Sequence, residues 1–185
     1  MTGIDPIEAA SALSDIDEIV RRVRQSRIYN LASLMLIMWG ALVFAGYLVT
    51  YLTPRYAGYA WIAVYVVGLS GSVAISASNR ARSGVRTFDH RMTAASVLFV
   101  AFGIFVCLQL GHFTPRQLGT FWPIYFMMVY TIAGLWAGRA FAAIGLSIIA
   151  LTLIGYYLVG DAFDLWMAFV NGGGLMLGGL WMRRS

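Results

Sequence analysis

Residues 118–159 decide the fold, and they read LGTFWPIYFMMVYTIAGLWAGRAFAAIGLSIIALTLIGYYLV. The stretch is almost continuously apolar, and Gly138-Arg139 is its only break. One helix of about 40 residues would extend roughly 60 Å, about twice the hydrocarbon thickness of a bilayer. The stretch therefore predicts two transmembrane helices joined by a tight hairpin at Gly138-Arg139. Pro123 then falls in the first turn of the earlier helix, where proline is tolerated.

Three further apolar stretches, each about as long as one helix of this pair, precede it, and one follows it. Of the 185 residues, 60% are hydrophobic and 11% are charged, whereas a soluble domain carries about a quarter charged residues. Without water to bond the backbone, such spans must be helices. We predict an all-α bundle of six transmembrane helices in residues 29–185, after a cytoplasmic segment 1–28. The predicted spans are about 29–51, 59–78, 93–112, 119–137, 140–159 and 163–181.

The distribution of arginine predicts the orientation of these helices. All 13 basic residues are arginine, and only Arg55 and Arg116 fall on the predicted outer side. The positive-inside rule therefore places both termini in the cytoplasm. Arginine without lysine, together with many alanines and glycines, suggests a GC-rich bacterial genome and hence a bacterial cytoplasmic membrane. The remaining arginines are Arg21, Arg22, Arg24, Arg27, Arg80, Arg82, Arg86, Arg91, Arg139, Arg183 and Arg184.

An amphipathic segment, residues 5–28, precedes the first span. Asp5-Pro6-x-Glu8 is a helix-start signal, and apolar residues recur after it at helical spacing, at Ile16, Ile19, Val20 and Val23. We expect one or two short helices here. They either lie on the inner leaflet with their arginines against anionic lipid, or dock on a cytosolic or membrane protein partner. Contact with lipid headgroups is also expected for Arg80, Arg82, Arg86 and Arg91.

Two predicted outer loops share one sequence pattern. They read Thr53-Pro54-Arg55-x-x-Gly58-x-x-Trp61 and Thr114-Pro115-Arg116-x-x-Gly119-x-x-Trp122. Each copy joins an odd-numbered helix to an even-numbered one, so the pattern predicts a parallel repeat of a helical hairpin. The third hairpin keeps only Trp166 at the equivalent place. We expect three hairpins, with proline and glycine shaping the loops and tryptophan anchoring the helices at the interface.

Four charged residues fall on the predicted outer face, namely Arg55, Arg116, Asp161 and Asp164. Two positive and two negative charges would balance if the hairpins pack in a ring. As exposed ion pairs they would contribute roughly 0–1 kcal/mol each. As a half-buried cluster they would gate a cavity or bind a polar or zwitterionic ligand.

Two amides and two pairs of glycines stand out at membrane depth. Gln109 and Asn171 are expected to form hydrogen bonds between helices, or alternatively to line a pore or ligand site. Two GxxxG patterns predict close packing of the fourth and sixth helices, within the bundle or between protomers of a homo-oligomer. These patterns are formed by Gly134 with Gly138 and by Gly174 with Gly178.

No sequence pattern points to catalysis, a metal or a cofactor. No acidic residue falls at membrane depth, which argues against ion-coupled transport. His90 and His112 are too far apart to be the axial pair of one haem, and the single Cys107 cannot form a cysteine-based metal site. The basic residues lie beside apolar spans, so we expect a membrane rather than a nucleic acid as their partner.

Three classes of function remain open at this stage. The first is a non-enzymatic regulatory, sensory or assembly subunit that acts through protein or lipid contacts, with residues 5–28 as its docking element. The second is a passive channel or small-solute permease, and the third is a lipid-active membrane enzyme. A polar cavity along the bundle axis would favour the channel, a dry core would favour the subunit, and polar side chains converging near the inner leaflet would favour the enzyme.

Overall fold

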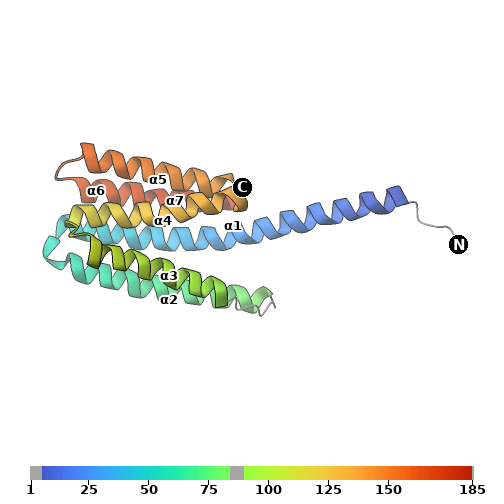
Figure 1. The fold of residues 1–185 in the computed structure, drawn as a ribbon, viewed down its shortest axis with the longest axis horizontal. Coiled ribbons are helices and arrows are strands. Elements are labelled where there is room, and N and C mark those ends of the chain that lie inside the picture. Colours follow the sequence, from blue (N-terminus) through green and yellow to red (C-terminus); the bar gives the residue numbers. More distant parts are fainter. Residues whose placement is uncertain (1–5, 84–89, 185) are drawn as a thin grey trace.

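The computed structural model describes residues 6–83 and 90–184 as a bundle of antiparallel helices (Figure 1). Within these ranges no strand is present. The helices are α1 (Pro6–Leu52), a 3-10 helix (Pro54–Tyr56), α2 (Ala57–Ser83), α3 (His90–Phe105), a π-helix (Val106–Leu110), α4 (Pro115–Ala137), α5 (Arg139–Leu158), α6 (Phe163–Met167), a second π-helix (Ala168–Gly173) and α7 (Gly174–Arg184).

Six segments of the described chain are long and apolar enough to cross a membrane. The sixth is not one regular helix, since α6, the second π-helix and α7 follow one another without a break. The prediction of six helical spans is confirmed, with boundaries within a few residues of those expected. The observed segments are Tyr29–Leu52, Pro54–Asn79, Thr93–Leu110, Pro115–Ala137, Arg139–Leu158 and Phe163–Arg184.

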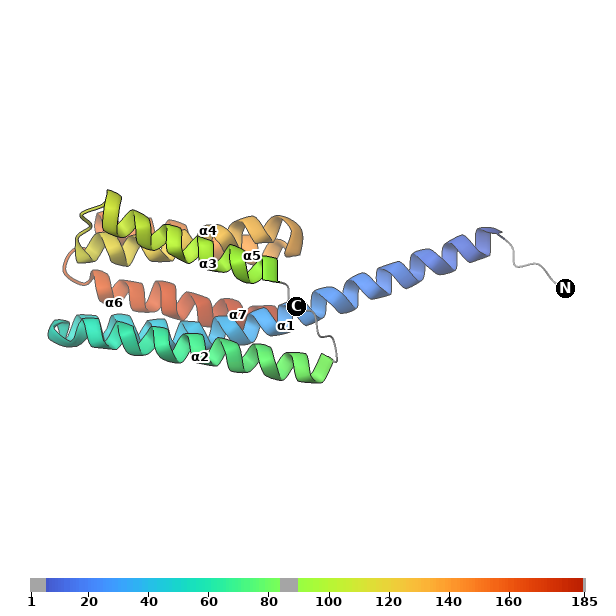
Figure 2. The same cartoon turned by 60° about the horizontal axis from the view of Figure 1, so that its bottom comes forward.

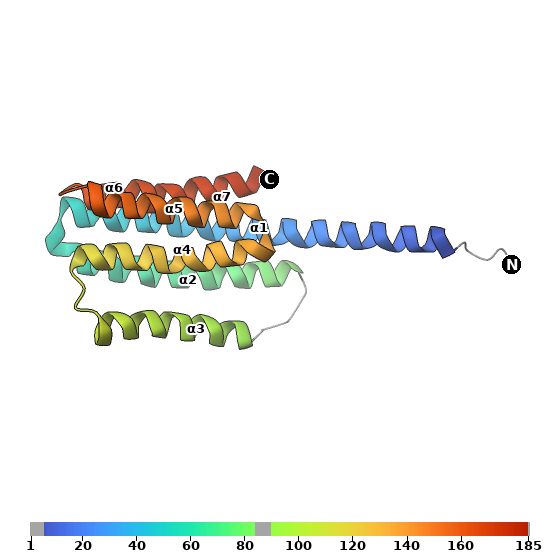
Figure 3. The same ribbon diagram turned by 45° about the horizontal axis from the view of Figure 1, so that its top comes forward.

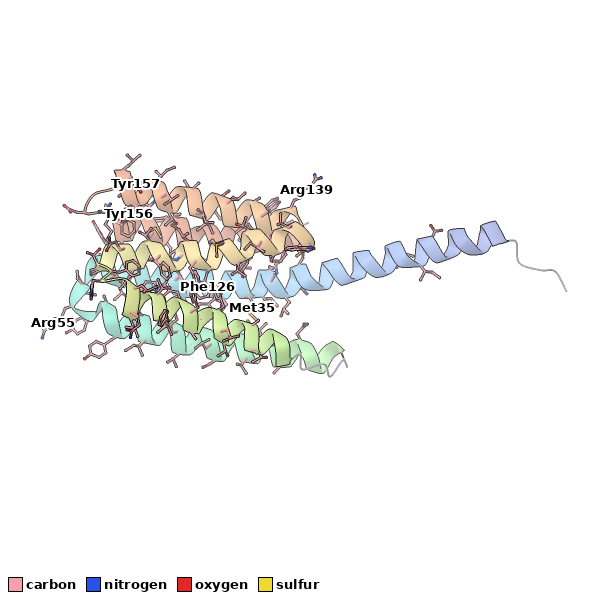
Figure 4. The ribbon with its side chains drawn as sticks, viewed as in Figure 1. Met35, Arg55, Phe126, Arg139, Tyr156 and Tyr157 are labelled. Atoms are coloured by element: carbon pink, nitrogen blue, oxygen red, sulfur yellow. The ribbon has the colours of Figure 1, made fainter. Side chains whose placement is uncertain are left out.

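The two ends of the bundle differ in what they carry. The C-terminus lies at the end from which α1 projects, and Arg139 lies at this same end (Figures 1, 3 and 4). We call this the terminal end. The opposite end, which we call the loop end, carries the loops at residues 53–56, 111–114 and 159–162, with Arg55, Tyr156 and Tyr157 near it (Figure 4).

Helix α1 differs most from its predicted form. Instead of one or two short helices followed by a span, a single helix of 47 residues runs from Pro6 to Leu52. Pro6 opens it, as the helix-start signal predicts, while Asp5 lies outside the described residues. Because only Tyr29–Leu52 is a candidate span, residues 6–28 extend about 35 Å further. Figures 1 and 2 show this projecting segment leaving the bundle nearly in line with the span.

Helices α4 and α5 form the tight hairpin that the sequence predicts. Gly138 alone joins them, and its φ of 134° lies in a region open to glycine but not to other residues. The two helices then run so close that a Cβ on Gly134 would lie 2.8 Å from the Cα of Ala142. Likewise a Cβ on Gly145 would lie 2.8 Å from the carbonyl oxygen of Met127.

The sixth span packs against α1 in the same manner. A Cβ on Gly40 of α1 would lie 2.8 Å from the carbonyl oxygen of Gly172, and a Cβ on Gly179 would lie 2.8 Å from that of Ser33. The Ser33 hydroxyl also donates a 2.7 Å hydrogen bond to the Gly179 carbonyl. Close backbone contact and a hydrogen bond between helices are the interactions that hold helices together in lipid.

Two clusters of apolar side chains fill the interior between α1 and the last three spans. The first centres on Leu36, Met127, Ile144 and Leu175. The second, nearer the loop end, contains Tyr47, Phe163, Met167 and Ala168. Apart from Trp61 of α2, which packs against the second cluster, helices α2 and α3 lie outside these clusters, and only 11% and 6% of their spans are buried.

Helix α3 is held mainly by aromatic contacts with α4. The Phe99 ring stacks on the Tyr125 ring at a centroid distance of 4.0 Å, and the Tyr125 hydroxyl donates a 2.9 Å hydrogen bond to the Phe99 carbonyl. Gly103 faces Trp122, where a Cβ would lie 2.9 Å from the indole ring. Helix α3 is therefore the most exposed of the spans, while α1 and α4–α7 form the compact part.

The α4–α5 contact can be tested with a pair of glycine substitutions. Gly134→Ala should destabilise the protein by about 1–3 kcal/mol, because its Cβ would press on the backbone of Ala142. Gly58→Ala is the control, since no atom lies within 4 Å of its Cβ position, and it should be neutral or slightly stabilising. Unfolding in mixed detergent micelles, followed by far-UV circular dichroism, would measure both. Equal stability of the two variants would contradict the packing described.

Candidate functional site

A buried polar junction links α1, α4 and the sixth span near the loop end. Pro123 lies inside α4, which begins at Pro115, so the expectation that Pro123 falls in the first turn is wrong. Proline has no N–H, and the carbonyl of Gly119, four residues earlier, therefore lacks its helical partner. The Tyr47 hydroxyl from α1 donates a 2.7 Å hydrogen bond to this carbonyl.

Asn171 completes the junction from the sixth span. It lies in the Ala168–Gly173 π-helix and is only 6% exposed, and its side chain lies next to the Tyr47 hydroxyl. π-Helical turns are rare and are often found at functional sites. One phenol group thus lies where three spans meet, and the hydrogen bond expected between helices at Asn171 stays a prediction.

Arg116 lies beside this junction and binds the C-terminal end of α5. Its guanidinium donates hydrogen bonds to the carbonyls of Tyr156 at 2.8 Å and Gly160 at 3.1 Å, and to that of Val159. It also lies over the Phe163 ring, 4.8 Å from the centroid. A cation at a helix C-terminus offsets the negative end of the helix dipole, so Arg116 fixes the loop between the fifth and sixth spans.

The four predicted outer charges occupy different surroundings. Arg55 and Asp161 are exposed, Asp164 is half-buried, and a Coulombic attraction acts between Arg116 and Asp164. Arg116 directs its hydrogen bonds to carbonyl groups. In residues 6–83 and 90–184 none of the four charges forms a direct ion pair. The structure thus brings Arg116 and Asp164 near each other and leaves Arg55 at the surface.

The two copies of the repeated loop differ in local structure. Pro54 opens a 3-10 helix and Trp61 donates a 3.1 Å hydrogen bond to the Thr50 hydroxyl. Pro115 instead opens α4 directly, behind a capping box formed by Thr114 and Gln117. The internal hairpin repeat stays a prediction.

The glycines of the pattern differ too. Gly58 has open space around it, whereas Gly119 lies against Phe163 and Tyr47.

The three tryptophans of the pattern are all half-buried and pack inward. Trp122 lies against Gly103 of α3. Trp166 donates a 2.9 Å hydrogen bond to the Leu151 carbonyl of α5. These contacts tie even-numbered spans to their neighbours, in addition to any role at the membrane interface.

The remaining intramembrane candidates separate into buried and exposed positions. Gln109 is exposed at the end of the Val106–Leu110 π-helix, so it does not share an interior surface with Asn171. Gly174 and Gly178 lie against Ile148 and Ile144 of α5. The glycines of both GxxxG patterns therefore serve packing within the bundle, or in the case of Gly138 the hairpin turn.

The projecting segment of α1 presents apolar side chains to its surroundings. Ile16 is 55% exposed and Ile19 is 61% exposed, and Asp15 and Ser26 of the same segment are also exposed. The side chains of the basic residues predicted to contact lipid lie outside the described part of the structure. These are Arg21, Arg22, Arg24, Arg27, Arg80, Arg82, Arg86 and Arg91.

Within the described ranges no group of three or more histidine, cysteine, aspartate or glutamate side chains could hold a metal ion. His112 is exposed and Cys107 is half-buried in the first π-helix. Comparison with known proteins gives no match to a family model, to a curated protein or to a solved structure.

Sequence reasoning missed the role of Tyr47. The available signal was the spacing of Gly119 and Pro123, because a proline inside a helix always frees the carbonyl four residues before it. Which side chain reaches that carbonyl depends on how α1 packs on α4, and periodicity in the sequence does not give this.

The junction can be tested with a double-mutant cycle. Tyr47→Phe should lower the free energy of unfolding by about 1 kcal/mol, the usual contribution of one hydrogen bond in a membrane protein. Pro123→Ala restores the N–H that bonds Gly119, so Tyr47→Phe should cost less in that background. Tyr157→Phe, at a position 77% exposed, is the control. Identical costs of Tyr47→Phe in both backgrounds would show that the proline and the phenol are not coupled.

Proposed function

We propose that the chain is a non-enzymatic regulatory, sensory or assembly subunit of a bacterial cytoplasmic membrane, with both termini in the cytoplasm. It acts by binding a protein partner through the projecting segment of α1. The observation that carries this proposal is the continuity of α1 from Pro6 to Leu52. One rigid element includes both the exposed segment and the helix around which the bundle is built.

The length of the projecting segment favours a protein over a lipid as its partner. Ile16 precedes the first residue of the span, Tyr29, by 13 positions, which is about 20 Å along a helix. This distance is more than the Debye length of about 8–10 Å at physiological salt, so attraction to the lipid headgroups is largely screened at that point of the helix. On a helix that leaves the bundle nearly in line with its span, Ile16 and Ile19 would lie beyond the bilayer surface. Exposed apolar side chains on a helix there fit a groove on another protein.

The position of α1 inside the bundle supports coupling between the two ends. The span of α1 packs on α2, on α6, on the second π-helix and on α7. At the loop end its Tyr47 forms the polar junction with Gly119 and Asn171. A change in tilt of the projecting segment would therefore act on the junction, and a change at the loop end would act on the projecting segment.

The two alternatives find less support. A channel would need a polar path along the axis, whereas both interior clusters consist of interlocking apolar side chains, and the two intramembrane amides are not brought together. A lipid-active enzyme would need convergent polar groups at the terminal end. The charged groups whose side chains are described there, Arg139, Arg183 and Arg184, are exposed.

Purification from the native membrane in mild detergent tests the proposal. At native expression level the full chain should retain a partner protein in fixed ratio, identified by mass spectrometry, and a variant lacking residues 2–27 should lose it. The truncation removes no residue of the predicted spans, so the bundle should remain folded. A lone protein or a homo-oligomer from both versions would overturn the proposal, and liposome flux assays would then test the channel alternative.

A pair of point substitutions locates the contact on the segment. Ile16→Glu combined with Ile19→Glu should reduce partner retention at least tenfold, because charges replace apolar side chains that the interface would bury. Asp15→Gln changes the neighbouring, exposed position and should leave retention within about twofold. Equal retention by the wild type, by the double variant and by Asp15→Gln would exclude Ile16 and Ile19 from the docking surface.

A further inference from the structure

A groove on the lipid-facing side of the bundle runs between α5 and α7, and we call it the α5–α7 groove. Its volume is about 290 Å³. Its largely apolar walls include Ala143, Ser147 and Leu151 of α5 and Val170, Leu177 and Trp181 of the sixth span. The side chains of Leu177 and Trp181 are 69% and 50% exposed, so the groove opens to whatever surrounds the spans.

The groove has the depth of one bilayer leaflet. From Ala143 to Leu151 it follows α5 for about 12 Å, and half of the hydrocarbon core is about 15 Å. Both walls belong to candidate membrane spans, Arg139–Leu158 and Phe163–Arg184. No residue that lines the groove is charged. These dimensions fit the acyl chain of a lipid in the leaflet at the terminal end.

The register of the two helices brings arginines together at one end of this groove. Gly178 lies against Ile144 and Gly174 against Ile148. A step of four residues along α5 thus matches a step of four residues backward along the sixth span. The same antiparallel register places Arg139 level with Arg183, at the terminal end. The arginines that α5 and α7 carry at this end, Arg139, Arg183 and Arg184, are exposed.

Two of these arginines share a helix face with the groove walls. Arg139 precedes Ala143 and Ser147 by four and eight residues, which places all three on one face of α5. Arg184 follows Trp181 and Leu177 by three and seven residues, which places it on their face of α7. Arg139 is also the first residue of α5, where the positive end of the helix dipole adds to its charge.

We propose that the α5–α7 groove is a binding site for an anionic phospholipid. One acyl chain lies along the groove, and the phosphate is held between Arg139 and Arg184. Apolar walls in one leaflet and positive charge at the headgroup level together match this amphiphile. A zwitterionic lipid would gain the apolar contact without a net attraction to the arginines. The site is independent of the docking function proposed for the projecting segment.

The test uses the full-length chain in detergent and native mass spectrometry, with phosphatidylglycerol and phosphatidylcholine of the same acyl chains as probes. The wild type should bind phosphatidylglycerol with the lower Kd. Arg139→Gln and Arg184→Gln should each raise that Kd about fivefold, as expected for one charge near the headgroups. Arg55→Gln, at the loop end (Figure 4), should leave it unchanged.

A second pair of variants tests the groove itself. Ser147→Phe fills it with a ring and should weaken binding of phosphatidylglycerol while both arginines remain. Leu146→Phe places the same ring on the neighbouring surface, at a residue that is 56% exposed and does not line the groove, and should have no effect. Equal Kd values for the two lipids, no response to the arginine variants, or a homodimer that Ser147→Phe dissociates would each overturn the proposal.

Discussion

Helix α1 and the sixth span approach each other so closely that only glycine fits between their backbones. Gly40 and Gly172 meet near the middle of the contact, and Gly179 lies on Ser33 nearer the terminal end. The placement of the α4–α5 hairpin in the compact part depends on this interface. It fixes the sixth span, against which α5 packs through Gly174 and Gly178. In lipid, where burial of apolar groups gives no net driving force, such close packing supplies the attraction.

The same interface also fixes the position of the projecting segment of α1. Because α1 is held along its whole span, the segment that continues beyond it is an extension of the core rather than a loosely attached tail. At the loop end, Tyr47 links α1 to the carbonyl that Pro123 leaves without a helical partner and to Asn171 in the π-helix. The molecule therefore offers a continuous mechanical path from the projecting segment to the loop between the fifth and sixth spans.

The number of spans was predictable because the apolar stretches are long and the breaks between them are sharp. Gly138 was predictable as the hairpin turn, since no single helix of about 40 residues fits a bilayer. The continuity of α1 was not, because residues 5–28 carry a helical pattern that also suits an interfacial helix. The role of Arg116 was not predictable either, because the arginine pattern is the same at Arg55 and only tertiary packing places one of them at a helix end. The outer charges and the intramembrane amides were identified as polar groups, but their partners required the fold.

The measurement that tests the account most directly is a distance between spin labels at positions 16 and 45, in a Cys107→Ala background and in lipid nanodiscs. Both native residues are exposed, and 29 residues of continuous helix separate the labels. A straight α1 predicts a distance of about 43 Å between the helix positions. A segment that turned at the membrane surface and lay on the leaflet would bring them to about 30 Å, and that result would contradict the account.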